Sequence, residues 1–126
     1  MYKLISIITS LLISISTLSQ TASFARAYEF HLGYKETKDS EVIWSRGNEV
    51  DMLVVISENT VKIYSSEIQE YRMVDNGKDF GTYTRYLAVD KSGLQCFLYL
   101  GSKEGNIYTV IEYGDYAWMY YLTPNN

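Results

Sequence analysis

Few side chains in this chain have the types and spacing that catalysis requires. The 126 residues include one histidine, His31, and one cysteine, Cys96. Histidine is the usual base near neutral pH, but no Ser, Cys or Asp stands at a recognised spacing from His31. His31 alternates with Phe30 and Leu32, so we expect an ordinary strand histidine on the face opposite to those two residues.

Cys96 lies in the apolar run LQCFLYL, on the face that it shares with Leu94 and Leu98. This position predicts a small buried hydrophobe, because a reactive thiol needs exposure and nearby positive charge. A single cysteine excludes an intramolecular disulfide and leaves an intermolecular one as the alternative. One His and one Cys cannot supply a His/Cys zinc site. We therefore expect no metal and no cofactor.

Two acidic residues lie within runs typical of strands: Glu70 in IQEYRMV and Glu112 in IYTVIEY. A facing pair of carboxylates can cleave glycosidic bonds, so a small carboxylate-dependent hydrolase is one alternative function. Asp90 and Asp115 fall at turns, where Asp is favoured for backbone reasons. Spacing does not bring any two acids together, and we expect solvated acids. The sequence carries no P-loop, dinucleotide-binding glycine motif, nucleophile elbow or calcium loop.

Aromatic side chains are the strongest functional signal, since the chain holds 13 tyrosines. They crowd the final predicted hairpin at Tyr113, Tyr116, Trp118, Tyr120 and Tyr121. Alternation places Tyr116, Trp118 and Tyr120 on one face of the last strand and Tyr121 on the other. Packing between strands is the default role of such residues, but Tyr and Trp are also common at interfaces and pockets. We predict that this hairpin is the contact region for a ligand or partner.

The elements that would position these residues show a period of two, with turn chemistry between the runs. Turn signals stand at Glu58-Asn59, Asn76-Gly77, Gly93 and Gly114-Asp115, and a loop is expected over 101–106. The predicted strands cover residues 27–35, 41–45, 51–57, 60–64, 68–74, 82–90, 94–100, 107–113 and 116–122. Residues 66–73 have a short helix as an alternative, because the spacing of Ser and Gln there resembles a capping box.

Short strands with short connections indicate a single all-β domain over residues 26–126. We predict a small antiparallel meander that closes, or partly closes, into a barrel; a two-sheet sandwich is the alternative. In the first predicted strand, one face carries Tyr28, Phe30 and Leu32. In strand count and aromatic content the domain resembles small calycin-type barrels. No motif accompanies this resemblance, so it implies a fold and no residue role.

Residues 1–25 are predicted to be a signal peptide. Lys3 provides a short positively charged start, and residues 4–18 carry no charge. Ser23-Phe24-Ala25 has small residues at the two positions that a signal peptidase recognises, so we expect a cut after Ala25. A retained membrane anchor is the alternative, although a spanning helix needs about 20 apolar residues. We thus expect an exported protein, in the periplasm, the cell envelope or the extracellular space.

Net charge narrows the range of partners. Without Lys3, the ten remaining Lys and Arg residues face fifteen Asp and Glu residues, so the domain is acidic. Nucleic acids and anionic membranes need clustered basic residues, and we expect neither as a partner. The sequence predicts a non-enzymatic binding or interaction module for a protein, a glycan or a small apolar ligand. A structural component of a cell-surface assembly, joined through an exposed strand edge, is a further alternative.

Overall fold

The computed structural model describes residues 22–37 and 39–124, and every helix or strand assigned there is a strand. The predicted leader lies outside these residues except for its last four. The strands are β1 (Ala22–Tyr34), β2 (Ile43–Trp44), β3 (Asn48–Ser57), β4 (Thr60–Tyr64), β5 (Ile68–Met73), β6 (Lys78–Asp79), β7 (Tyr83–Asp90), β8 (Gln95–Lys103), β9 (Asn106–Tyr113) and β10 (Tyr116–Pro124).

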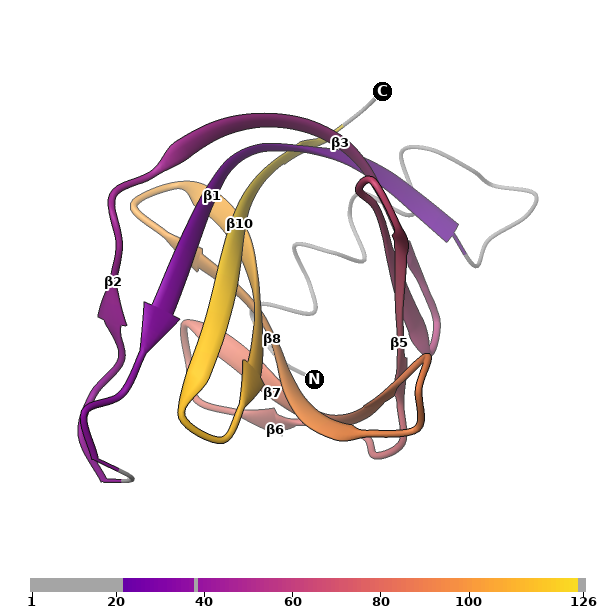
Figure 1. Cartoon of the computed structure of the whole chain (residues 1–126). Helices are drawn as coiled ribbons and strands as arrows, with labels where there is room; N and C mark the ends of the chain where they lie inside the picture. The colour runs from indigo at the N-terminus through magenta and orange to yellow at the C-terminus, as the bar shows by residue number, and fades with distance from the viewer. Residues whose placement is uncertain (1–21, 38, 125–126) are drawn as a thin grey trace.

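Eight of these strands form a closed antiparallel barrel. Neighbours follow the order β10-β9-β8-β7-β5-β4-β3-β1, and an antiparallel β1–β10 ladder closes the ring (Figure 1). The two short strands lie outside the ring, β2 against β1 and β6 against β7. The predicted barrel is confirmed. The sandwich alternative is wrong because β1 and β10 pair, and the helix alternative over 66–73 is wrong because β5 occupies that segment.

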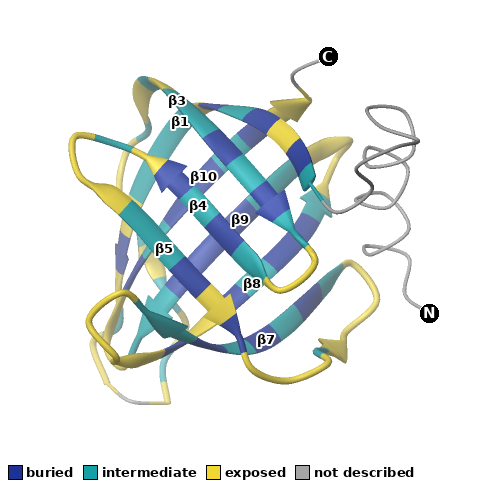
Figure 2. Ribbon diagram, turned by 90° about the vertical axis from the view of Figure 1, so that its right-hand side faces the viewer, coloured by how far each residue is buried: buried dark blue, intermediate teal, exposed yellow. Residues whose placement is uncertain are grey.

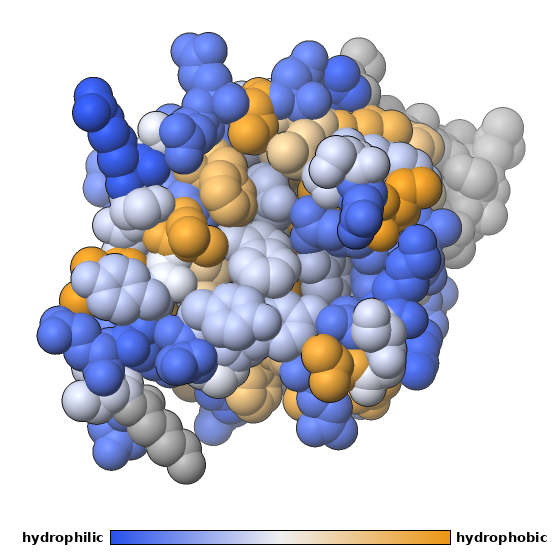
Figure 3. Space-filling view, viewed as in Figure 1, coloured by the Kyte–Doolittle hydropathy of each residue, from blue (hydrophilic) through white to orange (hydrophobic). Residues whose placement is uncertain are grey.

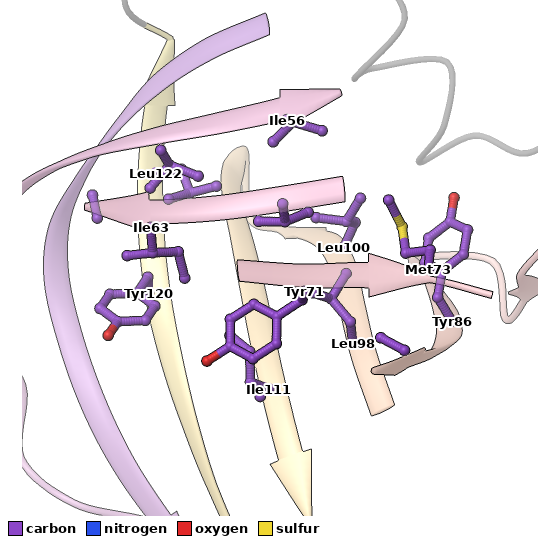
Figure 4. Packing of buried hydrophobic residues seen from close by; sticks show 14 of the residues in the cluster. Ile56, Ile63, Tyr71, Met73, Tyr86, Leu98, Leu100, Ile111, Tyr120 and Leu122 are labelled. Carbon is purple, nitrogen blue, oxygen red and sulfur yellow. The ribbon is translucent and has the colours of Figure 1, made fainter. Parts of the chain in front are cut away.

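Alternating side chains fill the interior of the barrel. Buried and more exposed positions alternate along the strands, as Figure 2 shows for β4 and β5. Ile63, Leu98 and Ile111 are completely buried and belong to one hydrophobic cluster, to which they come from three different strands (Figure 4). A ring of eight strands leaves an interior that side chains can fill. Its centre is therefore a packed core, and a ligand must bind at an end or on the outer wall.

A β-bulge corrects the prediction that Tyr28 shares a face with Phe30 and Leu32. Against β10 the register of β1 shifts between Ala27 and Glu29, and Tyr28 is the extra residue; against β3 the extra residue lies on β3. Phe30 packs against the core, but Tyr28 stacks on Tyr121, with ring centroids 6.4 Å apart, on the outside of the barrel. A bulge inserts one residue and so changes the side to which the alternation assigns its neighbours.

The β8–β9 connection is tighter than predicted. Both strands extend into the expected loop over 101–106, and only Glu104-Gly105 joins them. Both turn residues have positive φ, 53° and 84°, which is the geometry of a two-residue hairpin turn. Gly101 belongs to β8, where its missing side chain makes room for the ring of Tyr108. The two-residue turn at Glu58-Asn59 forms as predicted, without the positive φ expected at Asn59.

β5 and β6 together form one interrupted arm along the edge of β7. β5 pairs with β7 only over Tyr71–Met73, and β6 resumes the pairing at Lys78. The Asp75 carboxylate bridges the interruption by accepting hydrogen bonds from the backbone N–H groups of Gly77 and Leu87. Residues 68–70 of β5 therefore extend past the end of the β7 ladder and open the barrel wall there.

That opening lies at the end of the barrel we call the mouth, where the turns at residues 65–67, 91–94 and 114–115 come together. The mouth faces the viewer in Figure 1. It thus gathers the ends of strands that are far apart in the sequence.

Candidate functional site

An open pocket of about 570 Å³ occupies the mouth between β5 and the β7–β8 turn. It forms where the β5–β7 ladder stops short, so its position follows from strand pairing. In the view of Figure 3, pale residues of intermediate hydropathy fill the middle of this face, with hydrophilic residues and smaller hydrophobic patches around them. The lining residues are Glu67, Ile68, Gln69, Glu70, Tyr71, Asp90, Lys91, Ser92, Tyr113 and Trp118.

Three aromatic rings form a cluster at the edge of this pocket: Tyr113 and Trp118 line it, and Tyr116 packs against both. Tyr113 lies 5.6 Å from Tyr116 and 5.5 Å from Trp118, and the third pair is 5.9 Å apart, measured between ring centroids. The planes lie within 33° of one another, so the rings share a common orientation. Tyr116 is 47% exposed, whereas the other two rings are partly buried. This aromatic cluster therefore presents a joint apolar surface to the solvent.

Gln69 anchors the indole of the cluster. Its side-chain oxygen accepts hydrogen bonds from the Trp118 indole N–H at 3.3 Å and from the Tyr71 hydroxyl at 2.6 Å. Its amide nitrogen donates to the Tyr120 hydroxyl at 3.0 Å and to Ser65 Oγ at 3.2 Å. Every hydrogen-bonding position of one amide is thus used. No pattern in the sequence marked Gln69 for this role.

Asp90 anchors the second ring. Its carboxylate accepts a hydrogen bond from the Tyr113 hydroxyl at 2.6 Å and from the backbone N–H groups of Ser92 and Leu94. The bond from Tyr113, and then the backbone bonds, lower the pKa of Asp90. Burial, followed by the bond to Asp90, raises the pKa of Tyr113. The pair therefore stays as phenol donor and carboxylate acceptor at neutral pH, and it fixes the ring.

The rim of the pocket carries free carboxylates. Within residues 22–37 and 39–124, the carboxylates of Glu67 and Glu70 take part in no hydrogen bond or ion pair; the one side-chain bond at Glu67, from Ser65 Oγ, goes to its backbone carbonyl. Both can accept hydrogen bonds from a ligand. The pocket thus combines an ordered aromatic wall with unused polar acceptors.

The five aromatic residues predicted as a contact region do not form one surface. Tyr113, Tyr116 and Trp118 come together in the aromatic cluster. Tyr120 is 3% exposed and belongs to the core beneath them. Tyr121 lies on the outer wall, where it packs beside Val110, Met119 and other rings. The alternation of β10 separates these faces, as the sequence predicted.

The contacts of Cys96 and His31, the other candidate residues, are those of structural side chains. Cys96 is buried, as predicted, and burial raises the pKa of its thiol to about 11, so it is not a ready nucleophile. His31 lies on the outer wall, where one ring nitrogen contacts a Glu29 carboxylate oxygen at 2.6 Å and the other the Ser45 carbonyl at 2.8 Å. Both ring nitrogens are therefore engaged.

Glu70 and Glu112 do not face each other across a cleft. The Glu112 carboxylate accepts a hydrogen bond from the Tyr99 hydroxyl at 2.7 Å and pairs with the Lys35 ammonium at 3.1 Å. It lines a separate pocket beside Phe97, whereas Glu70 lines the mouth pocket. The arrangement offers no support for the carboxylate-dependent hydrolase.

Comparison with known protein families, curated proteins and solved structures finds no match for this chain. In the described part of the chain, no three His, Cys, Asp or Glu residues gather to hold a metal ion. No helix with the length and apolarity needed to cross a bilayer occurs among the same residues.

Proposed function

We propose that this protein is a non-enzymatic binding module that holds a glycan against the aromatic cluster at the barrel mouth. The observation that carries the proposal is the cluster itself, because Asp90 and Gln69 fix two of its rings before any ligand arrives. A surface that is ordered in advance loses little conformational entropy on binding.

The chemistry of the pocket favours a sugar. A pyranose ring has a face of C–H groups, which packs against an aromatic ring, and an edge of hydroxyls, which need hydrogen-bond partners. The aromatic cluster offers the first, and the carboxylates of Glu67 and Glu70 offer the second. A small apolar ligand fits less well, because the packed core leaves it only this polar rim.

A binding role also agrees with the ionisation of the site. A glycosidase needs one carboxyl group whose pKa is raised, so that it can donate a proton to the leaving group. Asp90 has a lowered pKa, and its oxygens already hold Tyr113 and two backbone groups. Asp90 thus acts as an anchor and not as an acid.

The first test uses tryptophan fluorescence. The chain has two tryptophans, so W44F leaves Trp118 as the only reporter. We expect soluble cello-, xylo-, malto- or chito-oligosaccharides to shift its emission to shorter wavelength, because a bound sugar excludes water from the indole. If none of the four series changes the emission, the glycan proposal is wrong.

The decisive variant is Tyr116→Ala. Tyr116 is largely exposed, so its loss should weaken binding about tenfold, the value of one stacked ring, while leaving the fold intact. Tyr28→Ala is the matched control, because Tyr28 is also exposed, at 39%, and lies on the outer wall beside Tyr121 and Asn106, at the end of the barrel opposite to the mouth. Equal losses from both variants would contradict the assignment. Trp118→Ala is a poorer test, since it also removes a partner of Gln69.

We further propose that the protein is exported through its N-terminal leader. The support is the uncharged segment over residues 4–18 and the small residues before the expected cut. Mass spectrometry of the protein recovered outside the cytoplasm should give a new N-terminus near Arg26. Recovery of only the uncut chain would reject the leader.

A further inference from the structure

Two like charges face each other on the outer wall, far from the aromatic cluster in the sequence. Lys78 of β6 stands directly opposite Arg85 of β7 (the two strands lie side by side in Figure 1). Directly opposed like charges destabilise a strand pair. Neither residue has an ion pair with a carboxylate in the described ranges. An acidic protein thus brings two cations together without a counter-charge.

Aromatic rings hold these cations in place. The Arg85 guanidinium carbon lies 5.1 Å from the Phe80 ring centroid and 4.8 Å from that of Phe97, and the Lys78 ammonium lies 5.3 Å from Phe80. Such contacts orient a cation through the face of the ring. They consume none of the five N–H donors of the guanidinium. The two side chains are therefore positioned with most of their donors unused.

The nearby acids are already engaged. Asp79, next to Lys78, accepts a hydrogen bond from the backbone N–H of Gly81 at 2.8 Å. The Glu112 carboxylate accepts a hydrogen bond from the Tyr99 hydroxyl, and its charge is balanced by Lys35. Within the described residues, none of these acids forms an ion pair with Lys78 or Arg85.

We propose that Lys78 and Arg85 form a binding site for a phosphate or sulfate group. A doubly charged oxyanion between them removes the repulsion and accepts several charge-assisted hydrogen bonds at once. The exposed edges of Phe80 and Phe97, 40% and 38% exposed, flank the site and leave it open to solvent. This site is independent of the glycan-binding mouth, so either proposal stands if the other fails.

NMR titration of the Arg85 side-chain Nε–H tests the site directly. The probes are inorganic phosphate and glucose 6-phosphate, each added at constant ionic strength set with sodium chloride. A saturating shift with either probe supports the site. Tighter binding of glucose 6-phosphate identifies a phosphate carried on a sugar, and equal binding identifies the free ion. If neither probe gives a saturating shift, the proposal is overturned.

Matched variants separate the site from general charge. Lys78→Gln should weaken phosphate binding about tenfold, the effect of losing one charge-assisted contact. Arg72→Gln removes the same charge from an exposed position on β5 and should leave binding unchanged. Equal weakening by the two variants, or none by Lys78→Gln, overturns the proposal. Lys78 is exposed, so its replacement does not endanger the fold, which circular dichroism can verify.

Discussion

At the scale of single residues, Gln69 makes four side-chain hydrogen bonds at the mouth, although the sequence did not single it out. One side-chain amide joins β5 to two rings of β10 and to the β4–β5 turn. Alternation could place Gln69 inside the barrel, but its partners Trp118 and Tyr120 lie about fifty residues away. No local pattern marks a side chain whose role depends on such distant contacts.

Replacing Gln69 with Leu should therefore destabilise the protein. The change leaves the hydroxyls of Tyr71 and Tyr120 and the indole N–H of Trp118 without their partner, and each orphaned buried group costs about 1–3 kcal/mol. We expect the free energy of unfolding, measured by urea denaturation, to fall by about 3 kcal/mol. Gln95→Leu is the control on an exposed site. A variant as stable as the control would show that water replaces Gln69.

At the scale of elements, period-two patterning predicted the eight barrel strands but not their exact ends. β6 was not predicted because it has only two residues and follows the interruption that the Asp75 side chain bridges. Tyr28 was placed on the wrong face because a bulge depends on the two partner strands and not on β1 alone. β1 also begins earlier than predicted, at Ala22. The prediction missed this start because the small residues there also match a signal-peptidase site.

The start of β1 gives a measurable consequence of processing. Residues 22–25 pair with β3, and Ser23 and Ala25 are buried there. A chain that begins at Arg26 loses this ladder and leaves the end of β3 with an unpaired edge. We expect its free energy of unfolding to be about 1–3 kcal/mol lower than that of a chain that begins at Ala22, which is the value of a few strand hydrogen bonds. Equal stability of the two chains would mean that residues 22–25 contribute nothing to the barrel.

At the scale of the whole molecule, barrel closure decides where function can reside. Composition and turn spacing indicated a barrel, but the mouth pocket depends on where the β5–β7 ladder ends, which is a long-range pairing. The same closure divides the tyrosines among the core, the mouth and the outer wall. Tyr71 and Tyr120, each 3% exposed, therefore report on the intact barrel and not on any one strand.

These buried tyrosines predict a loss of stability at alkaline pH. Burial, as the largest cause, raises the pKa of Tyr71 and Tyr120 in the folded protein, while in the unfolded chain a tyrosine ionises near pH 10. Below about pH 10 both states hold the proton, so stability does not depend on these groups. Above that pH the unfolded chain releases protons that the folded barrel retains, and the free energy of unfolding falls as pH rises.

Urea denaturation at a series of pH values, combined with ultraviolet absorbance of tyrosinate, measures this effect. Each deeply buried phenol should lower the free energy of unfolding by up to about 1.4 kcal/mol per pH unit above its unfolded pKa. The urea-unfolded protein provides the reference titration. In the folded protein some tyrosinate should appear only together with unfolding, in one cooperative step. If all tyrosines of the folded barrel ionise along the reference curve without unfolding, the interior is accessible to water and the packed core inferred for this barrel is wrong.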